Sequence, residues 1–261
     1  MKKRTSFKIF KSVIFALMLR EVKTRFIQNQ FSYLWAILEP VSHIVILSLI
    51  FSAFNPTGMM SGVPLPMFLM TGILPWMTFM NIVSKGMTGP EGNMGLFIYK
   101  NVKPIDTIIS RTLIETIVFT LSFIVLLFIG YLMGYDVSIQ NLQLFFISMI
   151  SLIILAFSLG LFFASISVVI TDLKKIIPMI MKPLYFVSGI FYTVNIIPEK
   201  YREINLYNPV INSLENLRYS MFKEITVSYG SLSYVSMFTL FVLVLAFIFY
   251  KKYEKTMIMS R

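Results

Sequence analysis

The chain has 261 residues, of which 57% are hydrophobic and only 13% are charged, with 25 Phe and 18 Met. A soluble core does not need this much apolar surface, so the composition indicates an integral membrane protein. The lack of cysteine excludes disulfides and thiolate metal sites, and the single histidine, His43, excludes most histidine-based metal clusters.

The N-terminal segment, residues 1–31, is expected to form an amphipathic helix over residues 6–30 that lies in the membrane interface. Its apolar residues are spaced for one helix face: Phe7, Phe10, Ile14 and Leu17. Glu21 and Arg25 are an i,i+4 pair of opposite charge, which supports a helix. We expect this helix to pack under the membrane spans.

Six apolar segments are long enough to cross a bilayer, which takes about 20 residues. They are residues 32–54, 64–84, 110–133, 142–170, 176–197 and 232–250. The fourth segment carries a stripe of small residues suited to close helix contact: Ala156, Gly160 and Ala164. The fifth is interrupted by Pro178, Pro183 and Gly189. The prediction is an all-α integral membrane fold, with a six-span domain over residues 32–250 and a cytoplasmic tail, residues 251–261.

Lysine and arginine decide the orientation of the spans, because they gather on the cytoplasmic side. Of the 23 such residues, only four lie in segments expected on the opposite side, all within residues 198–231. Both termini are therefore expected in the cytoplasm. The formal net charge of +11 is then a topology signal, and nucleic-acid binding is not expected.

Two connecting segments are expected to contain structure of their own. Residues 86–106, on the cytoplasmic side, are long enough to hold a short helix. Residues 195–231, on the external side, are amphipathic and are cut into short pieces by Pro198 and Pro209. The chain has no internal sequence repeat, which argues against a pseudo-symmetric single-chain transporter.

Motifs for nucleotide binding or catalysis do not occur in the chain. The Walker A pattern G-x-x-x-x-G-K-[ST] is absent, and the glycine-rich stretch from Gly86 to Gly95 lacks its Lys and its Ser or Thr. Neither H-E-x-x-H, G-x-S-x-G nor a paired-carboxylate cluster is present. The sequence therefore predicts no catalytic residue, no metal site and no bound cofactor.

Ionisable residues inside the spans are the first candidates for function. A charge near the bilayer centre costs about 2.5–3.5 kcal/mol, so such residues usually face protein or water. Glu39 is either a structural hydrogen-bond or ion-pair group near the cytoplasmic interface, or a residue at the mouth of a polar pathway. Lys182 either extends to the cytoplasmic surface or meets an anionic substrate. Glu115 is expected to be structural, with Arg111 one turn earlier as a candidate partner, and His43 to be a packing residue.

Aromatic residues within the interrupted fifth span are the second candidates. They are Tyr185, Phe186, Phe191 and Tyr192. Aromatic faces stack on sugar rings, so this group could line a pore that guides a polysaccharide without gripping it. Ordinary helix packing is the competing interpretation.

Several stretches resemble the membrane subunits of type-2 ABC exporters for bacterial surface polysaccharides. LREVKTRFIQNQFSYLWAILEP resembles their N-terminal signature, with R-E-x-K-T-R, Y-L-W-A and L-E-P, and LPMFLMTGILPW resembles their second span. GLFIYKNVKPIDTIISRTLIE resembles their first cytoplasmic loop and third span. PLYFVSGIFYTVNIIPEKYREINLYNP resembles their fifth span and external segment. The matches run in order along nearly the whole chain and look most like the capsule-exporting branch.

The resemblance implies a permease subunit that moves lipid-linked capsular polysaccharide across the inner membrane through a homodimeric channel. Two copies of a separate cytoplasmic ABC ATPase would hold ATP and magnesium. Periplasm-spanning and outer-membrane capsule export proteins would be further partners. The alternatives are an O-antigen or teichoic-acid-type glycan exporter of the same family, a membrane enzyme of glycolipid synthesis, and a non-transporting scaffold.

The resemblance also assigns roles to residues. Residues 195–231 would gate the channel externally. The aromatic residues of the fifth span would line the substrate channel: Tyr185, Phe186, Phe191 and Tyr192. Lys182 and Glu39 are added as channel candidates because of their charge inside the spans, and not because of the resemblance. Coupling to the ATPase would involve Arg20, Lys23, Arg25, Glu91, Asn93, Leu96, Phe97 and Tyr99.

Overall fold

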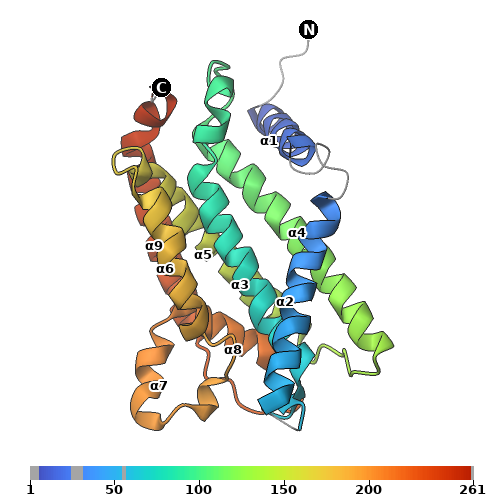
Figure 1. The fold of residues 1–261 in the computed structure, drawn as a ribbon. Helices are drawn as coiled ribbons and strands as arrows, with labels where there is room; N and C mark the ends of the chain where they lie inside the picture. The colour runs from blue at the N-terminus through green and yellow to red at the C-terminus, as the bar shows by residue number, and fades with distance from the viewer. Residues whose placement is uncertain (1–5, 25–31, 55–56, 260–261) are drawn as a thin grey trace.

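A computed structural model describes residues 6–24, 32–54 and 57–259, and over these the chain is mainly helical (Figure 1). Five of the described helices are long and apolar enough to cross a membrane. They are α2 (Ser32–Phe54), α3 (Leu65–Thr88), α4 (Pro104–Leu132), α5 (Leu142–Ser167) and α9 (Leu232–Met259). The expected all-α integral membrane class is confirmed.

Helix α6 (Leu173–Val187) differs from the expected fifth span. It has 15 residues, fewer than the roughly 20 that cross a bilayer. Pro178 and Pro183 lie inside it, and Gly189 just beyond it has φ 72°, the left-handed conformation that ends many helices. The expected bounds of 176–197 are therefore wrong at their C-terminal end, where the chain turns and forms the short helix η3 (Val194–Ile196).

The first described helix, α1 (Ser6–Val22), and the last turns of α9 lie at the same end of the bundle, here called the terminal end (Figure 1). Helix α1 confirms the expected N-terminal helix as far as it is described, while residues 25–31 lie outside the described part. It packs on α4, and Ile14 and Leu17 are buried, whereas Phe7 is 74% exposed. Only part of the expected apolar face is thus covered.

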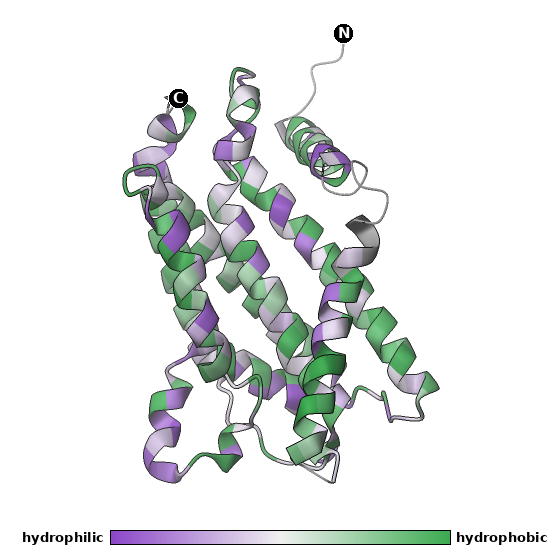
Figure 2. Ribbon diagram, in the orientation of Figure 1, coloured by the Kyte–Doolittle hydropathy of each residue, from purple (hydrophilic) through white to green (hydrophobic). Residues whose placement is uncertain are grey.

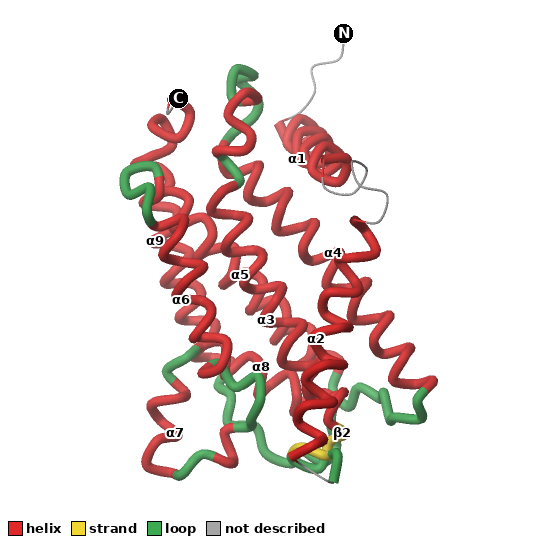
Figure 3. Tube along the Cα trace, viewed as in Figure 1, coloured by secondary structure: helices red, strands yellow, loops and turns green. Residues whose placement is uncertain are grey.

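The opposite end, here called the far end, carries short elements (Figure 3). They are the antiparallel strands β1 (Met59–Met60) and β2 (Val63–Pro64) and the helices α7 (Glu199–Leu206) and α8 (Pro209–Met221). Figure 2 shows α7 as mostly hydrophilic beside the hydrophobic long helices. Pro198 and Pro209 stand at the starts of α7 and α8, which confirms the expected division of this segment.

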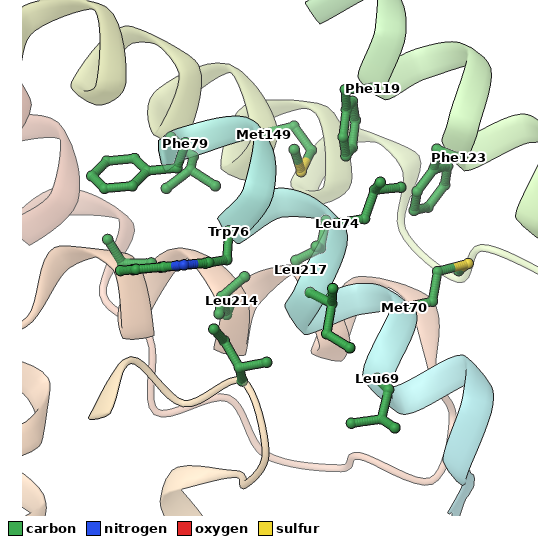
Figure 4. Packing of buried hydrophobic residues seen from close by; sticks show 14 of the residues in the cluster. Leu69, Met70, Leu74, Trp76, Phe79, Phe119, Phe123, Met149, Leu214 and Leu217 are labelled. Carbon is green, nitrogen blue, oxygen red and sulfur yellow. The ribbon is translucent and has the colours of Figure 1, made fainter. Parts of the chain in front are cut away.

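Helix α3 forms the centre of the bundle and packs against α2, α4, α5, α6 and α8. Figure 4 shows its side chains interleaved with those of α4, α5 and α8. It contacts α5 closely, since a Cβ built on Gly160 would lie 3.2 Å from the carbonyl oxygen of Ile82. Ala156 and Ala164 are buried as well, so the small-residue stripe serves helix packing as predicted.

At the terminal end, residues 89–103 join α3 to α4 and contain the 3-10 helix η2 (Glu91–Leu96). A short helix was expected in this region, and the structure confirms it. Asp106 in the first turn of α4 accepts a hydrogen bond of 2.9 Å from the backbone N–H of Lys103, which ends the loop and starts the helix. This segment is called the 89–103 loop below.

Candidate functional site

An aromatic cluster joins α2, α3 and α6. The ring of Tyr185 lies 5.1 Å from that of Phe191 and 5.2 Å from that of Phe186, both edge to face. Its hydroxyl shares a hydrogen bond of 3.1 Å with Nε2 of His43 on α2. Neighbouring rings complete the cluster: Phe51 of α2 stacks on Phe191, and Trp76 of α3 lies beside Tyr185. Three of the four expected aromatic residues are therefore brought together.

The interruption of α6 is what closes this cluster. Because the helix ends at Val187 and Gly189 turns the chain, Phe191 folds back against Phe186 with a centroid separation of 5.8 Å. Phe186 nevertheless remains 65% exposed, whereas Trp76 is buried. The cluster thus has a packed side toward α3 and an open side that offers an aromatic face.

Tyr192, the fourth expected aromatic residue, lies outside the cluster contacts. Its hydroxyl oxygen is 2.7 Å from the carbonyl oxygen of Val187 and 3.1 Å from Oδ1 of Asn205. It therefore connects the end of α6 to α7.

Glu39 and Lys182 flank the hydrogen bond between His43 and Tyr185. Both side chains are exposed. Glu39 precedes His43 by one helical turn on α2, and Lys182 precedes Tyr185 by one helical turn on α6. Two opposite charges therefore stand on the terminal side of the aromatic cluster, on neighbouring helices. Pro40 beside Glu39 is buried within α2.

Arg218 of α8 is a functional candidate that the sequence analysis missed. It is 1% exposed, and its guanidinium donates to the carbonyl oxygens of Gly189 (2.6 Å), Ile190 (2.7 Å) and Tyr192 (2.9 Å). It also lies over the ring of Phe68, 3.9 Å from its centroid. These carbonyls belong to the turn after α6, so Arg218 satisfies backbone groups that the broken helix leaves free.

The electrostatics of α8 fit this role. Burial lowers the pKa of Arg218 to about 10, which leaves the side chain protonated at neutral pH. Burial raises the pKa of Glu215, while the charge of Arg218 opposes that change. Oε1 of Glu215 accepts a hydrogen bond of 3.1 Å from the backbone N–H of Val194. Helix α8 therefore holds the chain after α6 through a donor and an acceptor.

At the terminal end, η2 contacts two helices. Arg20 of α1 donates a hydrogen bond to Oδ1 of Asn93, whose Nδ2 donates in turn to the carbonyl of Gly89 at 2.8 Å. Lys174 of α6 pairs with Glu91 at 2.7 Å. Three residues expected to couple to an ATPase thus make contacts within the chain.

The other expected coupling residues vary in exposure. Tyr99 and the neighbouring Ile98 are 65% and 85% exposed, so they form the open surface of the 89–103 loop. Phe97 is buried, and Leu96 lies beside α1 in a groove of about 550 Å³. Lys23 is exposed, while Arg25 lies outside the described residues.

Further ion pairs tie α1, α3 and α4 together near this loop. Nε of Arg111 lies 3.2 Å from Oε1 of Glu21, and its Nη1 donates to the carbonyl of Lys85 at 2.7 Å. The ammonium of Lys85 pairs with the buried Glu115 at 2.9 Å. Glu115 is thus a structural residue, as predicted, with a partner on α3.

Comparison with known proteins identifies the family to which the chain belongs. A family model described as ABC-2 type transporter matches residues 12–222. The chain belongs to the ABC-2 type transporter family. The polysialic acid transport protein KpsM of Escherichia coli is 36% identical over 257 residues, which cover 98% of this chain and 99% of that protein.

More distant relatives of this ABC-2 subunit match over similar lengths. The capsule polysaccharide export inner-membrane protein BexB of Haemophilus influenzae is 25% identical over 243 residues, covering 93% of this chain and 91% of BexB. The O-antigen export system permease protein RfbA of Klebsiella pneumoniae is 25% identical over 240 residues, with 90% of each chain covered.

Among the described residues of this ABC-2 subunit, no three His, Asp or Glu side chains lie close enough to hold a metal ion. As a membrane subunit of this family, the chain is not itself an enzyme.

Proposed function

We propose that the chain is the permease subunit of an ATP-driven exporter that moves lipid-linked capsular polysaccharide across the bacterial inner membrane. The observation that carries the proposal is the aromatic cluster at the break in α6, with Phe186 exposed and Lys182 one turn away. BexB is named a capsule polysaccharide export protein, which supports capsular polysaccharide as the substrate class, and KpsM is named for transport of a polysaccharide, polysialic acid.

The aromatic cluster suits a substrate that must slide. Aromatic faces offer apolar contact to the C–H faces of sugar rings and carry few directional hydrogen bonds. Each contact is weak, so a long glycan can pass from ring to ring. Lys182 supplies a positive charge near the same path, and an acidic glycan would be attracted to it in the low dielectric of the membrane.

Two copies of the chain would form the channel between them. Helices α2 and α6 support this arrangement, because both leave large apolar residues exposed: Val45, Leu49, Ile50, Met179, Ile180 and Phe186. These faces are available to a second copy or to lipid. The far-end helices α7 and α8 would gate the external mouth.

ATP hydrolysis would come from two copies of a separate cytoplasmic ABC ATPase, which would hold ATP and magnesium. The lack of a Walker A motif in this chain supports that division. The distribution of Lys and Arg supports a cytoplasmic terminal end. The 89–103 loop, with Ile98 and Tyr99 exposed, would then face the ATPase. Periplasm-spanning and outer-membrane export proteins would complete the path.

A second candidate is export of O-antigen, which the similarity to RfbA favours. The identity of 36% to KpsM against 25% to RfbA makes capsular polysaccharide the stronger candidate.

Deletion of the gene tests the proposed function. The expected result is polysaccharide that accumulates inside the cell and is lost from the surface, with both restored by the wild-type gene. A deletion strain with normal surface polysaccharide would contradict export. A strain that makes no polysaccharide at all would indicate a biosynthetic enzyme, and loss of surface O-antigen alone would select the second candidate.

A further inference from the structure

One ion pair joins the 89–103 loop to the start of α6. Nζ of Lys174 lies 2.7 Å from Oε2 of Glu91, with the two side chains 26% and 54% exposed. Glu91 is the first residue of η2, and Lys174 lies in the first turn of α6. Among the described residues, this is the only side-chain hydrogen bond or ion pair between that loop and α6.

Side-chain packing does not fill the space beside this pair. A cavity of about 210 Å³ lies between η2, the end of α5, the start of α6 and the end of α9. Glu91 and Lys174 line it, together with Met94, Ser167 and Met257. The ion pair therefore bridges a gap. An exposed ion pair contributes little to the stability of the fold. Its importance lies in the two elements that it connects, η2 and α6.

The rest of α6 determines what a pull at Lys174 would do. At the far end, Arg218 fixes the carbonyls of the turn that follows the helix. Between the two ends lie Pro178 and Pro183, which remove backbone hydrogen bonds and allow bending. Displacement of the terminal end would therefore concentrate as bending at these prolines, immediately before Tyr185.

We infer that the Glu91–Lys174 ion pair is the link through which movement of the 89–103 loop reaches the aromatic cluster. Both are positioning residues and lie outside the substrate path. The inference rests on the proposed function, in which a partner ATPase moves the loop. The pair stays closed during the cycle, α6 bends, and Tyr185 and Phe186 shift relative to α2.

Charge reversal tests the link in the complete complex with its ATPase. E91K and K174E should each lower the ratio of polysaccharide exported to ATP hydrolysed about five-fold or more, the lower end of usual coupling between sites. The double variant E91K/K174E should restore most of the ratio. K175E is the matched control, because Lys175 is the exposed neighbour and undergoes the same charge change. Its ratio should equal that of the wild type.

Cross-linking tests whether the link stays closed, and the chain has no native cysteine to interfere. The E91C/K174C variant loses the ion pair and should be uncoupled. A thiol-specific cross-linker as long as the ion pair should restore coupling, while E91C/K175C treated in the same way should not improve. A disulfide would be too short for positions whose side chains meet at their tips.

The outcomes separate this link from the proposed function. Normal coupling in E91K and K174E, or no rescue by the double variant, would overturn the link. So would a cross-linked E91C/K174C variant that remains uncoupled. In each case, export that depends on the gene would leave the proposed function standing, whereas normal export in the deletion strain would remove both.

Discussion

The two ends of α6 are held in opposite ways. At the far end a fully buried guanidinium donates to three backbone carbonyls. At the terminal end, one partly exposed ion pair is the side-chain contact to the 89–103 loop among the described residues, and it spans a cavity. A buried cation with several acceptors holds the turn after α6 in place, whereas the ion pair lets the start of the helix move together with the 89–103 loop. The comparison indicates a helix with one fixed end and one adjustable end.

The difference follows from where each end lies. The turn after α6 is covered by α8, so its free carbonyls have no access to water and need a protein donor. The start of α6 lies at the terminal end, where the cavity beside Glu91 and Lys174 leaves room for the helix end to move. Stability is therefore concentrated at the far end, and adjustment at the terminal end.

The largest expected effect is loss of the fixed end. R218A leaves three buried carbonyls without donors and should lower the free energy of unfolding by about 3–5 kcal/mol. The measurement is thermal unfolding of the purified, detergent-solubilised protein. The matched control is K223A, because Lys223 is a base just after α8 whose ion pair with Asp136 is exposed; it should leave Tm unchanged. R218K should fall between R218A and the wild type. Equal stability of R218A and K223A would contradict a fixed end.

A smaller effect on stability is expected at Gly72, where α3 closely approaches Arg218 and the turn after α6. A Cβ on Gly72 would lie 2.7 Å from the carbonyl oxygen of Ile190 and 2.8 Å from Nη2 of Arg218. G72A should therefore destabilise the protein by about 1–3 kcal/mol, the usual cost of overpacking. G95A, in the 89–103 loop, adds a Cβ with nothing within 4 Å and serves as the control. Equal unfolding temperatures of G72A and G95A would contradict the close approach of Gly72 to Ile190 and Arg218.

The smallest effect on stability, but a clear one on export, is expected between the two ends. F186A should leave Tm nearly unchanged, because the ring is 65% exposed. It should lower surface polysaccharide about two- to ten-fold, since an aromatic contact contributes about 0.5–1.5 kcal/mol. F241A is the control, because Phe241 on α9 is 61% exposed and lies outside the aromatic cluster. Equal export by the two variants would argue that the cluster only packs.

The sequence was sufficient to predict the long helices and the small-residue stripe around Gly160. Both depend on local features, namely the length of an apolar segment and the spacing of small residues within it. The sequence was insufficient for the end of α6, where Gly189 ends a helix that apolar composition alone extends to residue 197. Arg218 was missed because it was counted among the bases of an external segment. The available signal was its spacing from Ile211, Leu214 and Met221, which places a lone cation on a buried apolar face.

The contacts of the 89–103 loop lay beyond sequence reasoning for a different reason. Asn93 meets Arg20 of α1, and Glu91 meets Lys174 of α6, across long separations in the chain. A single sequence carries no signal for such pairs. Composition could identify the loop as a structured connection, but only the fold shows which helices it holds.

The most direct test of the central claim is a pair of distances measured by electron spin resonance, in the complex with its ATPase. One pair of spin labels at residues 175 and 251 reports the terminal end of α6 against α9. A second pair, at residues 187 and 219, reports its far end against α8, where Tyr219 is exposed. Labelled chains are mixed with excess unlabelled chains. On trapping ATP, the first distance should change by about 2 Å or more, as in helix shifts of switching proteins, while the second stays constant. A fixed first distance, or an equal change in both, would contradict a helix with one adjustable end.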